Sequence, residues 1–161
     1  MKKVSLIVLA LIILVFLFAS ISAVSAQPNA PIACVLDITY DDYIGPGEGY
    51  WLGTVTGCSI EGTIRFDAVP EEYFDAGKTT HFVEEFTIEP YSGGVIKGKN
   101  WGVWNFSTFK FRANGWVTDA SAEWAHLVGF KYHEMGTTSN PADGLPLTAP
   151  DGTMRLVPAN R

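Results

Sequence analysis

Ile60-Glu61-Gly62-Thr63-Ile64-Arg65-Phe66-Asp67-Ala68 is the stretch that decides the fold, because small or apolar residues alternate in it with polar ones at every step. A period of two residues is that of a β-strand, in which successive side chains point to opposite faces. One face of this strand carries Ile64 and Phe66, and the other carries Thr63 and Arg65. We therefore expect a strand with one buried and one solvent-facing side.

The same alternation extends along the chain in both directions from this strand. It predicts further strands at residues 34–40, 50–57, 82–88, 95–103, 109–112 continuing through 114–118, 126–132 and 154–157. Helical pattern is confined to residues 119–127, and residues 137–152 have the composition of a long surface loop. We predict an all-β fold, a single antiparallel β-barrel of about eight strands, because closure removes exposed sheet edges. A two-sheet β-sandwich is the alternative.

The N-terminus has the three parts of a secretory signal, namely Lys2 and Lys3, an apolar run from Val4 to Ala19, and small residues up to Ala26. We predict a signal peptide over residues 1–26, a single barrel domain over 27–161, and a secreted protein that has no membrane contact after cleavage. Because the apolar run approaches the length that spans a bilayer, a retained membrane anchor at residues 4–23 is the alternative. Lipid attachment at Cys34 is a further one.

Charge and motifs narrow the classes of partner. The formal net charge is −6, and loss of Lys2 and Lys3 with the signal would make it −8. Nucleic acids and anionic lipids bind clustered Lys and Arg, which are scattered here, so the sequence argues against both. The sequence has no nucleophile elbow of the kind found in serine hydrolases, and its glycine turns are not phosphate-binding loops, so no cofactor is predicted. His81 and Glu85 share a strand face but would lie about 13 Å apart, too far for one ion, so no metal is predicted.

Cys34 and Cys58 are the only cysteines, and both fall in the part predicted to be exported. Oxidising conditions outside the cytoplasm let a bridge persist, so we expect a disulfide between them. Two buried free thiols are the alternative.

Glu84 is the most informative single residue, because the strand period places it on the same side as Phe82 and Phe86. An ionised carboxylate on an inward face must find a partner or take up a proton. It would then act as an acid, a base or a hydrogen-bonding site for a ligand. The structural alternative is that it pairs with Arg112, Lys110 or a backbone amide, or that a bulge turns it outward.

His126 is predicted to face inward with Tyr132 on the strand at residues 126–132, where it would form an acid and base couple with Glu84. Further hydroxyl and amide groups would complete a polar patch on the wall of the barrel, namely those of Thr54, Thr56, Tyr132 and Asn114. A buried histidine that only packs in the core is the alternative. All of these orientations depend on strand register, which one bulge reverses.

Three segments resemble small secreted proteins of unassigned function. They are Trp101-Gly102-Val103-Trp104-Asn105-Phe106, Phe111-Arg112-Ala113-Asn114-Gly115-Trp116-Val117-Thr118 and Leu127-Val128-Gly129-Phe130-Lys131-Tyr132-His133-Glu134-Met135-Gly136. Those proteins are in turn loosely similar to allene-oxide-cyclase-like and lipocalin-like barrels, which are calycin-like folds. The resemblance implies a barrel and transfers no functional residue.

The function predicted is that of a secreted, non-catalytic barrel that binds a small, largely apolar molecule, with Glu84 and His126 fixing its polar part. An isomerase or cyclase that uses the same two residues is the first alternative. The chain's five tryptophans suggest a carbohydrate-binding module as the second, because aromatic faces stack on sugar rings, although core packing explains most tryptophans. Trp101 and Trp104 are an odd number apart and should face opposite ways. A structural envelope protein is the third alternative.

Overall fold

The computed structural model describes residues 30–45, 48–144 and 146–159, so the predicted signal peptide and the alternative anchor lie outside the described residues. The described residues form nine strands, β1 (Ile32–Gly45), β2 (Glu48–Thr56), β3 (Gly62–Ala68), β4 (Phe74–Ala76), β5 (Thr79–Pro90), β6 (Ile96–Asn105), β7 (Lys110–Ala120), β8 (Lys131–Thr137) and β9 (Thr148–Val157). Three short 3-10 helices interrupt them, η1 (Pro70–Glu72), η2 (Ala122–Leu127) and η3 (Pro141–Asp143). Within the described residues, no helix has the length and apolar content needed to span a bilayer.

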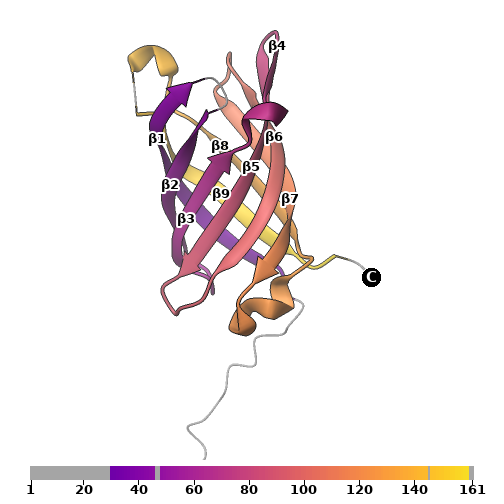
Figure 1. Cartoon of the computed structure of the whole chain (residues 1–161). Coiled ribbons are helices and arrows are strands. Elements are labelled where there is room, and N and C mark those ends of the chain that lie inside the picture. The colour runs from indigo at the N-terminus through magenta and orange to yellow at the C-terminus, as the bar shows by residue number, and fades with distance from the viewer. Residues whose placement is uncertain (1–29, 46–47, 145, 160–161) are drawn as a thin grey trace, which may run out of the picture.

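The strands form one antiparallel sheet in the order β3-β2-β1-β9-β8-β7-β6-β5-β4, and an additional pairing of β3 with β5 closes it (Figure 1). Eight strands make the closed ring, and β4 extends beyond it as a hairpin with β5. The predicted all-β barrel of about eight strands is therefore confirmed, and the β-sandwich alternative is wrong.

β3, the strand that the alternation predicted first, takes the expected orientation. Ile64 and Phe66 are buried inside the barrel, whereas Thr63 is exposed on the outer wall. In the pairing that closes the ring, Phe66 lies opposite Phe86 and Ile64 opposite Ile88. Apolar side chains from the first and last strands of the ring thus meet across the closing seam.

The packed core fills one half of the barrel. Most of its members are buried side chains from every strand of the ring and from the turns at one end, namely Cys34, Leu36, Val55, Ile60, Ile64, Phe66, Phe86, Ile88, Ile96, Val117, Leu127, Phe130, Tyr132, Met154 and Leu156. The cluster also includes Ile38, Phe111 and Ala149. η2 lies at this end, at the bottom in Figure 1, and contributes the buried Leu127. This end of the barrel is therefore plugged by side chains.

Glycines on the inner face of β6 make room for aromatic rings from β5. A Cβ added at Gly98 would lie 2.2 Å from the ring of Phe86, and one added at Gly102 would lie 2.3 Å from that of Phe82. Close packing leaves no space for both a ring and a methyl group at these places. Glycine at these two positions of β6 is therefore required by the packing of the aromatic rings of β5.

Two predicted segments begin or end at other residues than expected, and one strand was not predicted. The strand expected at residues 126–132 begins only at Lys131, because η2 and a turn at Gly129, whose φ is 87°, occupy the preceding residues. β9 begins at Thr148, so the loop expected over residues 137–152 is shorter than predicted. β4 was not predicted, since its Phe74-Asp75-Ala76 sequence is too short to show a period.

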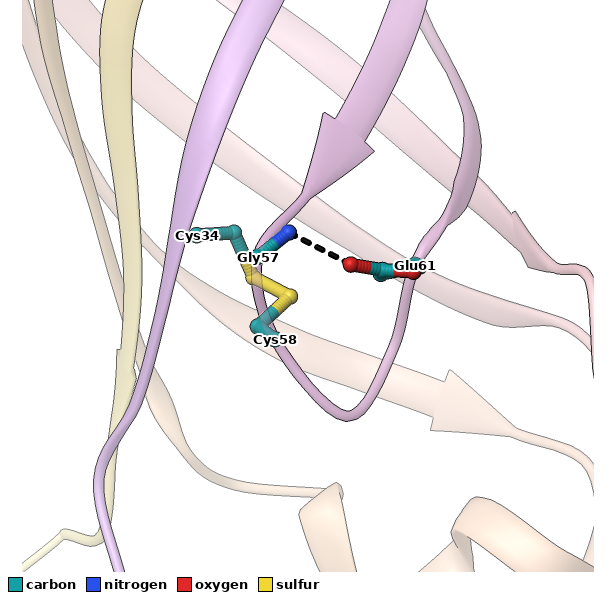
Figure 2. Close-up of a disulfide and its surroundings, with 4 residues drawn as sticks. All are labelled: Cys34, Gly57, Cys58 and Glu61. Carbon is teal, nitrogen blue, oxygen red and sulfur yellow. Dashed lines mark hydrogen bonds between the residues drawn. A yellow bond between two sulfur atoms is a disulfide. The ribbon is translucent and has the colours of Figure 1, made fainter.

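The predicted disulfide is present and joins Cys34 of β1 to Cys58 in the turn between β2 and β3 (Figure 2). The two Cα atoms lie 5.1 Å apart, and the cysteines are separated by 24 positions in the sequence. In the same turn the backbone N–H of Gly57 donates a hydrogen bond of 2.6 Å to Glu61. The disulfide excludes the alternative of two free thiols.

Replacing both cysteines with alanine should lower the free energy of unfolding by about 3 kcal/mol, because the disulfide limits the conformations of the unfolded chain. Urea unfolding followed by tryptophan fluorescence would measure the change. As a control, a reducing agent should destabilise the natural protein by a similar amount and leave the C34A/C58A variant unaffected. Equal stability of the oxidised and reduced natural protein would contradict this expectation.

Candidate functional site: a cup in one half of the barrel

The other half of the barrel holds a cavity of about 510 Å³, which we call the cup. It is lined by residues from seven strands of the ring, from β4 and from the adjoining loops. They are Ile38, Tyr40, Trp51, Phe66, Ala68, Tyr73, Asp75, Thr80, Phe82, Glu84, Trp104, Phe111, Glu134, Thr138, Pro141 and Leu147. Cavities of roughly 300 to 1,000 Å³ are usual for small-molecule sites.

The cup reaches the surface at the end of the barrel opposite η2. Asp75 of β4 and Pro141 of η3 line it and are exposed to solvent. Figure 1 places β4 and η3 at this same end. The opening of the cup therefore lies at the end of the barrel that carries β4 and η3.

Hydrogen bonds order the side chains around this opening. The Thr80 hydroxyl donates to Asp75 at 2.7 Å, which ties β4 to β5. The Trp104 indole N–H donates to the Thr138 hydroxyl at 3.2 Å, and that hydroxyl donates to the carbonyl of Phe109 at 3.3 Å. These bonds hold Trp104 against the loop that follows β8, so this part of the wall is fixed before any ligand arrives.

The walls of the cup are mostly aromatic. Tyr40 and Trp51 pack with their ring centroids 5.0 Å apart. Trp104 also lines the cup, whereas Trp101, three residues earlier on β6, is 49% exposed on the outer wall. The prediction that these two tryptophans face opposite ways is confirmed. Such a lining suits an apolar molecule or the face of a cation.

At the bottom of the cup, where it meets the packed core, four polar side chains form what we call the floor cluster: Glu84, Asn100, Tyr132 and Glu134. All are buried, with exposures of 7% and 4% for the two glutamates and 0% for the other two. Tyr132 stacks on Phe86 with a centroid distance of 4.3 Å, which ties the cluster to the core below it.

Hydrogen bonds connect the members of the floor cluster. The Asn100 amide donates to Glu134 at 3.4 Å and also forms a hydrogen bond with Glu84. The Tyr132 hydroxyl donates to the other oxygen of Glu134 in a short hydrogen bond. The Asn100 carbonyl oxygen is buried and has no hydrogen-bond partner among the described residues. A single amide thus bridges two carboxyl groups, and one acceptor in the cluster stays open.

Burial makes both carboxyl groups weak acids. It raises the pKa of Glu134 from 4.5 to about 7, although the hydrogen bond from Tyr132 opposes the shift. Burial, followed by repulsion from Glu134, holds the pKa of Glu84 well above its usual range. Burial and the neighbouring Glu134 likewise raise the pKa of the Tyr132 hydroxyl. Both shifts favour the protonated form of these carboxyl groups, and a pKa of about 7 leaves Glu134 about half ionised near neutral pH.

The structure divides the predicted site residues into two groups. Glu84 and Tyr132 face inward as predicted. Thr54, Thr56 and Asn114 lie on the outer wall of the barrel. On β2 and β7 it is the neighbouring residues, Val55 and Ala113, that point inward and are buried. Asn114 instead pairs with the ring of His133 at 2.7 Å. The predicted inward orientation of these three residues was wrong.

His126 is also placed differently from the prediction. It lies exposed in η2, at the plugged end of the barrel, and its ring is 6.2 Å from that of Trp124. It does not line the cup, so the predicted couple with Glu84 does not form. Lys110 and Arg112, offered as structural partners of Glu84, are exposed on the outer wall of β7. Glu84 is bonded to Asn100 instead.

Glu134 and Asn100 are site residues that the sequence analysis missed. Glu134 is two residues after Tyr132, so the same alternation that placed Tyr132 inward would have placed it there too. Asn100 lies between Gly98 and Gly102 on a strand face with few apolar side chains. The sequence pattern therefore gave no indication that Asn100 is buried. In the described part of the chain, no group of three or more histidine, cysteine or acidic residues is arranged to hold a metal ion.

Comparisons with protein-family models, curated proteins and solved structures found no match to this chain. The resemblance to allene-oxide-cyclase-like and lipocalin-like barrels therefore stays a prediction. What the geometry defines is a closed β-barrel with one plugged end and one internal cup whose floor is acidic.

The floor cluster makes stability depend on pH. Because the folded state raises the pKa of Glu134 above 4.5, the folded protein binds protons more tightly than the unfolded chain between pH 4.5 and about 7. The free energy of unfolding should therefore fall as the pH rises through this window, by about 3 kcal/mol for a shift of this size. Urea unfolding across the window would measure the decrease.

The variant Glu134→Gln should reduce this pH dependence and be more stable than the natural protein above neutral pH, since it removes a buried charge and keeps an acceptor for Tyr132. Glu85→Gln is the matched control, because Glu85 is exposed on the outer wall of β5. An unchanged pH slope in the E134Q variant would show that the carboxyl group of Glu134 is not titrating in this range.

Proposed function

We propose that this protein is an exported, non-catalytic carrier that binds a small, largely apolar molecule in the cup. The observation that carries the proposal is the cavity of about 510 Å³, open at one end of a barrel whose other end is filled by side chains. A cavity that is walled by aromatic rings and has a few polar groups at its floor matches the general form of small-molecule sites. The aromatic walls give affinity through apolar burial, and the floor cluster orients the ligand.

Export is proposed on two grounds. The N-terminal sequence has the form of a secretory signal. The Cys34–Cys58 disulfide belongs to a class of bond that persists in oxidising compartments and is rare in the cytosol.

Filling the cup should weaken binding. The uncharged fluorescent probe N-phenyl-1-naphthylamine should bind the natural protein with a rise in its emission, and Ala68→Trp should weaken binding by at least about tenfold, because the new ring occupies the cup. Thr63→Trp is the matched control, since Thr63 lies on the same strand but on the outer wall. Equal weakening by both variants, or no binding to the natural protein, would contradict a site in the cup.

A second candidate function, a proton-transfer isomerase or cyclase, is favoured by the raised pKa of Glu134, about 7, which suits an acid or base near neutral pH. Its catalytic groups would be Glu84 and Glu134 in place of the predicted Glu84 and His126. The carbohydrate-binding alternative would depend on Trp101 and Trp116, both exposed on the outer wall.

Deuterium exchange separates a carrier from an isomerase. If Glu134 acts as a base, the natural protein should exchange the α-hydrogens of a bound cyclic ketone for solvent deuterium, whereas the E134Q variant should bind the ketone without exchange. Proton magnetic resonance of the recovered ketone would measure this. As a carrier, the protein should bind the ketone with no exchange above the rate in buffer, which is the outcome we expect.

A further inference from the structure

The charges around the cup narrow the class of molecule that it would hold. Among the described residues that line it, three are acidic, Asp75, Glu84 and Glu134, and none is lysine, arginine or histidine. A ligand with a carboxylate or phosphate group would bring a further negative charge into this lining without a basic partner. The cup is thus unsuited to fatty acids and other anionic lipids.

Hydrogen bonding at the floor leads to the same conclusion by a separate route. The donors of the floor cluster are engaged within it, because the Tyr132 hydroxyl bonds Glu134 and the Asn100 amide bonds both glutamates. What the cluster presents to the cup are the carboxyl groups of Glu84 and Glu134. Behind this lining, the carbonyl oxygen of Asn100, which lies opposite Glu84 in the pairing of β5 with β6, has no hydrogen-bond partner among the described residues. A buried acceptor without a partner is unfavourable, so the floor favours a ligand group that donates hydrogen bonds.

The geometry points to a protonated primary amine on an apolar body as the ligand class, with the ammonium group at Glu84 and Glu134 and the apolar body against the aromatic walls. This inference rests on the proposed function, because it names the ligand of the same cup. An ammonium group supplies three further donors for the carboxyl oxygens and a positive charge, which the floor cluster lacks. The aromatic rings around the cup add a favourable electrostatic environment for a cation.

Binding of such a ligand would release protons. Glu84 faces Asn100, Glu134 and Tyr132, and Asp67 on β3 acts on it electrostatically, while Asp75 at the opening is bonded to Thr80. No basic side chain that lines the described cup competes for the carboxylates. An arriving ammonium group would stabilise the ionised glutamates, so the affinity for it should rise as the pH increases from about 5 to 8.

The test compares ligands that share one chain and differ in the head group. Octylamine, octanol, octanoate and octyltrimethylammonium would each compete with N-phenyl-1-naphthylamine for the full exported chain at about pH 8, where the charged hydrogen bonds of an amine should make octylamine at least about tenfold tighter than octanol. Octanoate should bind most weakly. The trimethylammonium compound should bind less tightly than octylamine because it has no N–H to donate.

Variants locate the preference. The double substitution Glu84→Gln and Glu134→Gln should remove the advantage of octylamine over octanol, measured in the same variant, together with its pH dependence. Asp75→Asn is the matched control, because it removes a carboxylate at the opening of the cup and should keep the advantage. If the double variant does not fold, the single variants Glu84→Gln and Glu134→Gln should each reduce the advantage.

The outcomes separate this inference from the proposed function. Failure of the probe to bind, or equal binding by the A68W variant, would overturn the proposed function itself. Probe binding together with octanol or octanoate at least as tight as octylamine would overturn the amine inference and leave the carrier in place. An octylamine preference that survives in the variants lacking both floor carboxylates, but is lost in D75N, would move the head group to the opening and would also overturn it.

Discussion

The pairing of β3 with β5 is the interaction on which the rest of the structure depends. It runs from Gly62 opposite Pro90 to Ala68 opposite Glu84, and it turns an open sheet into a ring. Without it the sheet would have a free edge on β3, and its apolar face would not be enclosed. Because it is antiparallel and in register, it also fixes which side chains point inward on both strands. The position of Glu84 inside the barrel follows directly from this register.

The inside of the ring is divided near Tyr132 into a packed half and the half that holds the cup. Below it, large apolar side chains and Leu127 of η2 fill the space. Above it, rings line much of the wall of the cup, and two of them, Tyr40 and Trp51, pack against each other. Gly102 of β6 leaves room for the ring of Phe82 on this wall. A barrel of eight strands is just wide enough for side chains to fill it or for one small ligand to occupy it. In this barrel, side chains fill one half, and the other half holds a cavity of the size that a small ligand needs.

The sequence alone predicted the barrel fold and the inward position of Glu84, and particular residues show why. The alternation around Phe66 and Phe86 is strict, so it predicted both strands and the burial of Glu84. His126 was misplaced because a two-residue pattern continues by chance through η2, where Gly129 at a φ of 87° and a tight turn end it. Thr54 and Thr56 were assigned to the wrong face, because a strand with mixed residues on both sides does not reveal its register. Which residues meet across the barrel, as Asn100 and Glu134 do, depends on pairings of distant segments that local pattern does not contain.

Ionisation of the two buried glutamates destabilises the folded state, so their presence indicates a functional role. The rise in the pKa of Glu134 to about 7 corresponds to a destabilisation of about 3 kcal/mol once the group is ionised, a large part of the stability of a small domain. A pair of apolar side chains of similar size would avoid this loss, and no basic residue lines the described cup to offset it. Local features that oppose stability without compensation inside the protein are typical of functional sites. Here the missing compensation is a positive charge with hydrogens to donate, and the cup opens a path for it to arrive from outside.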